Sequence, residues 1–220
     1  MAAFKPGFTS EFNEFEAPDA GHQKNAKTAR LVESARLALT SLALCSSIII
    51  LGTSGDTLSV FNTTHFRNNS ILSLWPAKFD LRPTVALIVC SAIVVAASAL
   101  SVAASKISAV RNKPLVHSSI SFLAPTVCLI AGLVGTSFFY GVNSSNSVSS
   151  LQSWSCQWSS VNMDVKPHWS TLCKESKAAL YLTVMLIPLE VIILGTVAFG
   201  AFVEKKQVVY HERKGSPAMS

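Results

Sequence analysis

Four long apolar segments, each about as long as a membrane span, separate the polar parts of the chain. Charged side chains are scarce in them: Val85 to Ser105 has none, and Ala178 to Val203 has only Glu190. A helix needs about 20 apolar residues to cross the hydrocarbon core of a bilayer. The sequence therefore predicts an all-α, polytopic membrane protein: a four-transmembrane-helix bundle with helices over about 31–53, 83–105, 115–140 and 178–203.

The polar segments predict two long outer loops and two tails around this transmembrane domain, which spans 31–203. The loops cover 54–82 and 141–177, and both lie on the side opposite the termini. We expect the tail over 1–30 to be disordered, because Pro6 and Gly7 would interrupt a helix and several acidic residues follow them. It lacks the features of a signal peptide, so the first helix is expected to serve as an uncleaved insertion signal. The tail over 204–220 is basic and suited to anionic lipid.

Composition agrees with this interpretation. Hydrophobic residues make up 50% of the 220 residues and charged residues only 14%, whereas soluble domains contain about 25% charged residues. Lysine and arginine near the spans favour cytosolic termini under the positive-inside rule. The basic residues on the terminal side are Lys24, Lys27, Arg30, Lys106, Arg111, Lys113, Lys205, Lys206, Arg213 and Lys214, against Arg67, Lys78, Arg82, Lys166, Lys174 and Lys177 on the other side.

Three glycosylation sequons agree with this orientation. Asn62, Asn68 and Asn143 each begin an Asn-x-Ser/Thr motif in the two outer loops. Glycosylation of such a site requires exposure outside the cytosol. Asn143 is the closest to the membrane, so Asn62 and Asn68 are the better candidates.

The cysteines divide in the same way. Cys45, Cys90 and Cys128 lie inside predicted helices, where small apolar packing is the favoured role. Cys156 and Cys173 share the second outer loop, and on the oxidising side of a membrane they are expected to form a disulfide. A metal site there is disfavoured, because it would need about four ligands.

All four tryptophans also fall in the outer loops. The favoured interpretation is an interfacial aromatic belt together with packing of a small disulfide-stapled cap. The alternative is an exposed aromatic surface that binds a sugar or a protein partner. The residues concerned are Trp75, Trp154, Trp158 and Trp169.

Glu190 is the most unusual residue in the predicted spans, because a charged group near the bilayer centre costs about 3 kcal/mol or more. No lysine or arginine is expected at its depth, so the carboxyl is expected to be protonated and to donate a hydrogen bond. This structural role is favoured over proton coupling of the kind found in small four-helix multidrug exporters. The candidate hydroxyl partners are Thr40, Ser41, Ser91, Ser98 and Thr126.

Small residues recur at four-residue spacing in three predicted helices, as in Ala92-xxx-Ala96, Ala97-xxx-Ser101, Ala131-xxx-Gly135 and Thr196-xxx-Gly200. Such faces let helix backbones approach closely. They suit a tight bundle, or lateral association with copies or other membrane proteins.

No catalytic constellation is present: the sequence has no GxSxG, HExxH, CxxC or phosphate-binding loop. We therefore expect no enzyme activity, no catalytic residue, no cofactor, no metal site and no nucleic-acid partner. The lipid bilayer is the expected partner of the transmembrane domain, and the sequence does not identify a small-molecule ligand.

Four spans, cytosolic termini and a cysteine-bearing second outer loop resemble the MARVEL-type tetraspan proteins of fungi and animals. The run CKESKAALYLTVMLIPLEVIILGTVAFG resembles the stretch where the last loop cysteine of that family leads into its fourth helix. LWPAKFDLRPT is similar to fungal integral membrane proteins of this kind. Unlike claudin-like proteins, the chain has no cysteine in its first loop, and the CCG motif of tetraspanins is absent. The resemblance implies a role in membrane organisation, trafficking or cortical domains.

The resulting hypothesis is a non-enzymatic scaffold or organiser of the plasma membrane or secretory pathway. One alternative is a small proton-coupled transporter, or a transporter's auxiliary subunit, that uses Glu190. Another is a cell-surface receptor or adhesion protein that uses the tryptophan-rich outer loop.

Overall fold

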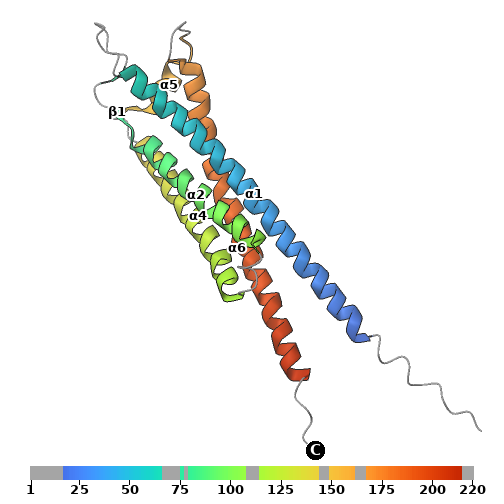
Figure 1. Ribbon diagram of the computed structural model, residues 1–220. Helices are drawn as coiled ribbons and strands as arrows, with labels where there is room; N and C mark the ends of the chain where they lie inside the picture. Colours follow the sequence, from blue (N-terminus) through green and yellow to red (C-terminus); the bar gives the residue numbers. More distant parts are fainter. Residues whose placement is uncertain are drawn as a thin grey trace, which may run out of the picture.

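The computed structural model describes residues 17–65, 75–76, 79–107, 114–143, 149–161 and 167–214. Within these ranges the elements follow one another as α1 (Ala17–His65), β1 (Phe79–Asp80), α2 (Arg82–Lys106), α4 (Pro114–Asn143), β2 (Ser149–Ser150), α5 (Leu151–Gln157) and α6 (Trp169–Lys214). Figure 1 shows these elements as a bundle of long helices.

Four of these helices are long and apolar enough to cross a membrane. Their apolar parts are Arg30–Thr64, Arg82–Lys106, Ser119–Val142 and Trp169–Val203. This confirms the predicted number of long apolar helices and their order along the chain. A short parallel pairing of β1 with β2, Phe79 with Ser149 and Asp80 with Ser150, was not expected from the sequence.

The ends of α1 and α6 differ from the predicted boundaries. Residues 17–30 belong to α1, so this part of the first tail is helical rather than disordered, and residues 204–214 of the basic tail belong to α6. Alanine, lysine, glutamate and glutamine, which are common there, favour helix. Residues 1–16 and 215–220 of the predicted tails lie outside the described residues.

At their other ends, α1 and α6 continue into the predicted outer loops. The run after Thr53 looks like a loop, because Gly55, Asp56 and several hydroxyl residues follow one another. In the structure the hydroxyls of Thr57, Thr63 and Thr64 bond back to carbonyl groups of the same helix, as in Thr57 Oγ1 to the Ser54 carbonyl at 2.8 Å. Apolar residues further along are buried against other elements, and this packing outweighs the low helix propensity of the run.

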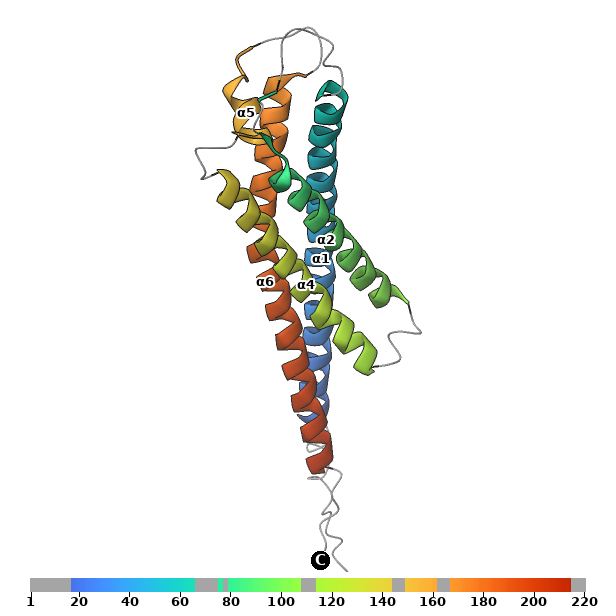
Figure 2. The ribbon, with the colours of Figure 1, turned by 90° about the vertical axis from the view of Figure 1, so that its left-hand side faces the viewer.

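The helices pack as two pairs. α1 lies beside α6 and α2 lies beside α4, and the two pairs contact each other. The N-terminal end of α1 and the C-terminal end of α6 lie at the same end of the bundle and extend beyond α2 and α4 (Figure 1). We call this the terminal end. α5 and β1 gather at the opposite end, the cap end, as a second view confirms (Figure 2).

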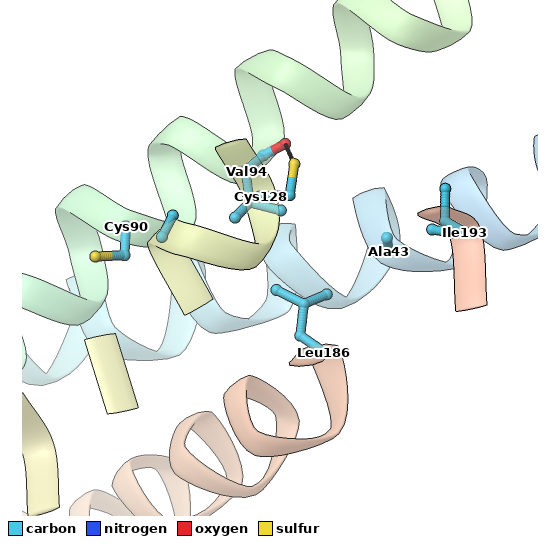
Figure 3. Close-up of a cluster of buried hydrophobic side chains, with 7 residues drawn as sticks. Ala43, Cys90, Val94, Cys128, Leu186 and Ile193 are labelled. Atoms are coloured by element: carbon cyan, nitrogen blue, oxygen red, sulfur yellow. Dashed lines mark hydrogen bonds between the residues drawn. The ribbon is translucent and has the colours of Figure 1, made fainter. Parts of the chain in front are cut away.

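Three buried apolar clusters follow one another from the cap end toward the terminal end. The first contains Val60, Phe61, Trp75, Leu151, Trp169 and Leu172; the second Ile50, Leu87, Phe139, Ala179 and Leu180; the third Ala43, Cys90, Val94, Cys128, Ala131, Leu186 and Ile193. Figure 3 shows side chains of the third cluster converging from α1, α2, α4 and α6.

The outward faces of the four long helices are also apolar. Ile49 on α1, Ile93 on α2, Leu123 on α4 and Met185 on α6 are all exposed. Large exposed apolar side chains on every long helix suit surroundings that are themselves apolar.

Small residues bring α4 close to α2. A Cβ atom at Gly135 would lie 3.5 Å from Cys90 Cβ, and Ala131 is buried one turn earlier. The predicted Ala131-xxx-Gly135 face is therefore a helix contact within the chain. Ala92 and Ala96, by contrast, are exposed on α2. Their face does not contribute to the packing of the bundle.

Candidate functional site

Glu190 lies in the middle of the bundle and borders a small polar cavity. Its side chain is 2% exposed, and its Oε1 atom has no hydrogen-bond partner among the described protein groups. The cavity has a volume of about 10 Å³. All four long helices contribute to its lining, which consists of Arg36, Thr40, Ser98, Ser101, Ser121, Ala124, Pro125, Cys128, Glu190 and Ile193. We call it the central cavity.

Arg36 on α1 brings a positive charge to the central cavity. It is 6% exposed, and a guanidinium group stays charged in proteins. One of its nitrogen atoms donates to Ser121 Oγ, and another forms an ion pair of 3.1 Å with Glu33 Oε1. The Glu33 side chain is 45% exposed, so this polar chain runs from the surface near the terminal end into the bundle.

The expectation that no basic residue accompanies Glu190 was therefore wrong. It rested on counting depth separately along each helix, and that count gives neither the relative shift of α1 and α6 nor the reach of a long arginine side chain. The structure places both groups on one cavity. In the described part of the chain the ion pair of Arg36 is nevertheless with Glu33, not with Glu190.

The predicted hydroxyl partners of Glu190 separate into two groups. Thr40 and Ser98 line the central cavity. Ser41 and Thr126 are exposed and donate to carbonyl groups of their own helices, at 2.8 and 2.7 Å. Ser91 is buried but donates to the Ile88 carbonyl at 3.0 Å, away from this lining.

The two hydroxyls at the cavity have partners of their own. Thr40 donates to the Arg36 carbonyl at 2.8 Å, and Ser98 Oγ lies 3.8 Å from Cys128 Sγ. Cys128 in turn approaches the Val94 carbonyl at 4.0 Å, the dashed contact in Figure 3. Two of the expected hydroxyls thus line the same cavity as Glu190, but none of the described protein groups is bonded to its Oε1.

The cap end is held by the predicted disulfide. Cys156 on α5 and Cys173 on α6 are bonded across 17 residues, which confirms the prediction. α5 begins at a capping box, in which the Ser150 side chain accepts from the Ser153 amide and the Ser153 side chain accepts from the Ser150 amide. The capping box fixes the start of α5, and the disulfide holds α5 against the first turns of α6.

An aromatic cluster completes the cap. Trp75 forms edge contacts with Phe61 at 4.8 Å and with Trp169 at 5.2 Å between ring centroids, and Phe61 stacks on Phe79 at 5.0 Å. The Trp75 indole nitrogen donates to Thr64 Oγ1 at 3.1 Å. We call these aromatic residues, together with the disulfide, the aromatic cap.

Burial distinguishes the two interpretations of the tryptophans. Trp75 and Trp169 are only 3% and 4% exposed, so they pack inside the aromatic cap. Trp158 is 41% exposed and lies 5.7 Å from Trp154, centroid to centroid. An exposed surface built from all four tryptophans is therefore wrong, because two of them fill the interior of the cap.

The sequons are only partly described. Asn62 is exposed on the last turns of α1, not in a loop as expected, because α1 continues to His65. Thr64, the hydroxyl residue of its motif, accepts the bond from Trp75. Asn68 lies outside the described residues, and of Asn143 the structure describes only the backbone, at the end of α4. Glycosylation stays a prediction at all three positions.

The fold and both sites fall within one family domain. The family described as Domain of unknown function (DUF8762) matches residues 3–214. The chain belongs to this family. No curated protein and no solved structure matches the chain. The match covers the central cavity and the aromatic cap, so both are parts of the DUF8762 domain rather than additions to it.

Within the described ranges, no group of three or more histidine, cysteine, aspartate or glutamate residues is arranged to hold a metal ion. The expectation that this DUF8762 protein uses no metal or cofactor stays a prediction. The chemistry that the central cavity offers is hydrogen bonding and charge, from one carboxyl, one guanidinium and several hydroxyl groups.

Sequence analysis missed a regular pattern that predicts the polar interior of the bundle. Thr40, Ser47 and Ser54 on α1 are spaced by seven residues, and all three are buried. Thr84, Ser91 and Ser98 on α2 have the same spacing and are also buried. A seven-residue spacing keeps side chains on one helix face, the face that meets a neighbouring helix. The pattern would have selected Thr40, Ser91 and Ser98 as inward-facing over the exposed Ser41 and Thr126.

Proposed function

We propose that the protein is a non-enzymatic four-span membrane protein that organises membrane domains or trafficking. It acts through lateral contacts with other membrane proteins or with its own copies, and not through turnover of a substrate. The plasma membrane or the secretory pathway is the proposed location, with both termini in the cytosol. The disulfide agrees with an oxidising environment at the cap end.

The observation that carries this proposal is the aromatic cap. The disulfide joins α5 to α6, and Trp75 contacts Phe61 of α1 and Trp169 of α6. A covalent link and a buried aromatic cluster hold the ends of α1 and α6 together. Alternating access requires one part of a bundle to rock against another, and such a clamp opposes that motion. A rigid bundle with apolar outward faces suits a scaffold.

The resemblance to MARVEL-type tetraspan proteins supports the same role, since that family is associated with membrane organisation and trafficking. The exposed Ala92 and Ala96 on α2 add a small-residue face that the chain itself leaves uncovered. Such faces permit close lateral helix contacts in lipid.

The proposal is tested by removing the protein from cells that normally make it. Membrane proteins that can be cross-linked to it in native membranes are first identified, and their lateral distribution is then imaged with and without it. We expect the clusters of these neighbours to disperse, and to reform when wild type or the Glu190→Gln variant is restored. An unchanged distribution in the absence of the protein would contradict an organising role.

A second candidate function, proton-coupled transport or assistance to a transporter, is favoured by one specific observation. Glu190 and Arg36 line the same cavity, and the ion pair of Arg36 reaches Glu33 near the terminal end. Ionisable groups inside spans often mark ion or proton pathways. This function predicts proton or solute flux into sealed liposomes that contain the purified protein. It also predicts that Glu190→Gln abolishes the flux while leaving expression intact.

A further inference from the structure

We propose that the central cavity is a water-binding site, in which a water molecule hydrogen-bonds to Glu190 and joins it to the polar chain that leads to the terminal end. The first support is the unpaired Oε1 atom of Glu190 on a side chain that is 98% buried, the complement of its 2% exposure. An unpaired buried oxygen costs about 1–3 kcal/mol, and more if it is charged. A water molecule is the smallest partner that removes this cost.

The size and lining of the cavity agree with this ligand. Its volume of about 10 Å³ is near the lower limit for one water molecule, which is roughly 10–15 Å³. A buried water also needs about two to four polar partners. Besides Glu190, the lining offers the hydroxyl groups of Thr40, Ser98 and Ser101.

The groups around the central cavity allow water to reach it from one end of the bundle. Toward the terminal end, the lining includes Arg36 and Ser121, and Arg36 is paired with the half-exposed Glu33. Toward the cap end, the next buried cluster consists of the apolar side chains of Ile50, Leu87, Phe139, Ala179 and Leu180. Water therefore reaches Glu190 from the terminal end, and the apolar cluster separates it from the cap end.

The proposal does not depend on the scaffold function. A hydrated carboxyl that opens to one side stabilises the bundle without forming a path across the membrane. It equally suits the first half of a proton pathway, so the cavity and the function are tested by different experiments.

The test is water-edited solid-state NMR of the full chain in bilayers, with ¹³C-labelled glutamate and isoleucine. This experiment measures how fast magnetisation passes from water protons to each labelled carbon. The Glu190 Cδ signal is identified by its loss in Glu190→Gln. Ile50, which is buried in the apolar cluster, gives the slow reference, and the half-exposed Glu33 gives the fast one. We expect transfer to Glu190 to be several-fold faster than to Ile50.

A matched pair of variants on α2 locates the water. Ser98→Val fills the cavity and removes one of its hydroxyls, whereas Ser91→Val makes the same change one heptad away, outside the lining. We expect transfer to Glu190 to slow several-fold in Ser98→Val and to be unchanged in Ser91→Val. If the rate of magnetisation transfer from water to Glu190 were the same in both variants, the water would lie elsewhere and the proposal would be overturned.

A second pair tests the side from which water enters. Ser121→Val narrows the lining toward the terminal end, and Ser54→Val makes a similar change on the cap side of the apolar cluster. Slower transfer only in Ser121→Val supports the one-sided site; slower transfer only in Ser54→Val contradicts it. Because wild type alone already distinguishes a wet cavity from a dry one, transfer to Glu190 as slow as to Ile50 overturns the proposal even where a variant fails to fold.

Discussion

The aromatic cap and the central cavity differ in whether the buried polar group at the centre of each has a hydrogen-bond partner within the chain. In the cap, the large aromatic ring of Trp75 is buried, and its indole nitrogen donates a hydrogen bond to Thr64 Oγ1. In the cavity, Glu190 is buried equally well, yet its Oε1 has no partner among the described protein groups. Trp75 is thus satisfied by contacts made within the chain, whereas those contacts leave the Glu190 carboxyl unsatisfied. We infer that the cap fixes the bundle and that the cavity only accommodates a polar residue within it.

The largest effect is expected from removing the centre of the cap. Trp75→Ala should lower the free energy of unfolding by about 3–5 kcal/mol, because a buried aromatic ring is lost and a cavity remains. Trp158→Ala, which removes a ring that is 41% exposed, should cost much less. Denaturant unfolding in detergent, followed by circular dichroism, measures both. Equal losses in the two variants would mean that the cap does not have a buried centre.

Loss of the disulfide should have the next largest effect. Cys156→Ser together with Cys173→Ser should destabilise the protein by about 3 kcal/mol, since the link closes a 17-residue separation and constrains the unfolded chain. Cys45→Ser changes a free, exposed cysteine and serves as the control. The same unfolding assay, run with and without reductant, should show reductant sensitivity in wild type but not in the double variant.

The contact between α2 and α4 connects the two regions and should have an intermediate effect. Gly135→Val places extra methyl groups against Cys90 and Leu87, and overpacking of this kind costs about 1–3 kcal/mol. Gly141→Val lies on the same helix in open space and is the matched control. Thermal unfolding should separate the two variants; if both behave like wild type, α2 and α4 do not pack as described.

The smallest effect is expected at Glu190. Glu190→Gln keeps the shape and hydrogen-bonding capacity of the side chain, so the change in the free energy of unfolding should stay within about 1 kcal/mol. Glu190→Leu removes the polar group but keeps a side chain in the same place, so it shows how much the polarity of the carboxyl contributes to the free energy of unfolding. A loss in Glu190→Gln as large as that in Trp75→Ala would reverse the comparison, making the cavity rather than the cap the main source of stability.

Features that depend on residues within one helix or loop could be predicted from the sequence. Features that depend on how two helices are placed relative to each other could not. The apolar runs around Val94 and Leu186 predicted long helices, and the shared loop predicted the Cys156–Cys173 bond, both from local patterns. That Arg36 and Glu190 line the same cavity depends on how far α1 is shifted along α6, which no single segment contains. The burial of Trp75 likewise depends on α1 continuing past Thr53 to bring Phe61 and Thr64 to the cap.

The buried hydroxyl residues of the bundle could be predicted in part. Single hydroxyl residues on a helix do not show which side faces inward, and for this reason Thr40 and Ser41 looked equivalent. The seven-residue repeat of Thr40, Ser47 and Ser54 does contain that information, and it would have placed Thr40 on the inward face of α1. Arg36 lies on a second repeat of buried residues with the same spacing, which continues through Ala43 and Ile50.

The central claim is that the cavity accommodates Glu190 within the bundle and does not conduct protons. The most direct measurement is proton flux into sealed liposomes that contain the purified full chain, driven by an imposed pH gradient and membrane potential. We predict that wild type and Glu190→Gln both give the same flux as protein-free liposomes. Flux through wild type that Glu190→Gln abolishes would contradict the account and establish Glu190 as a transport residue.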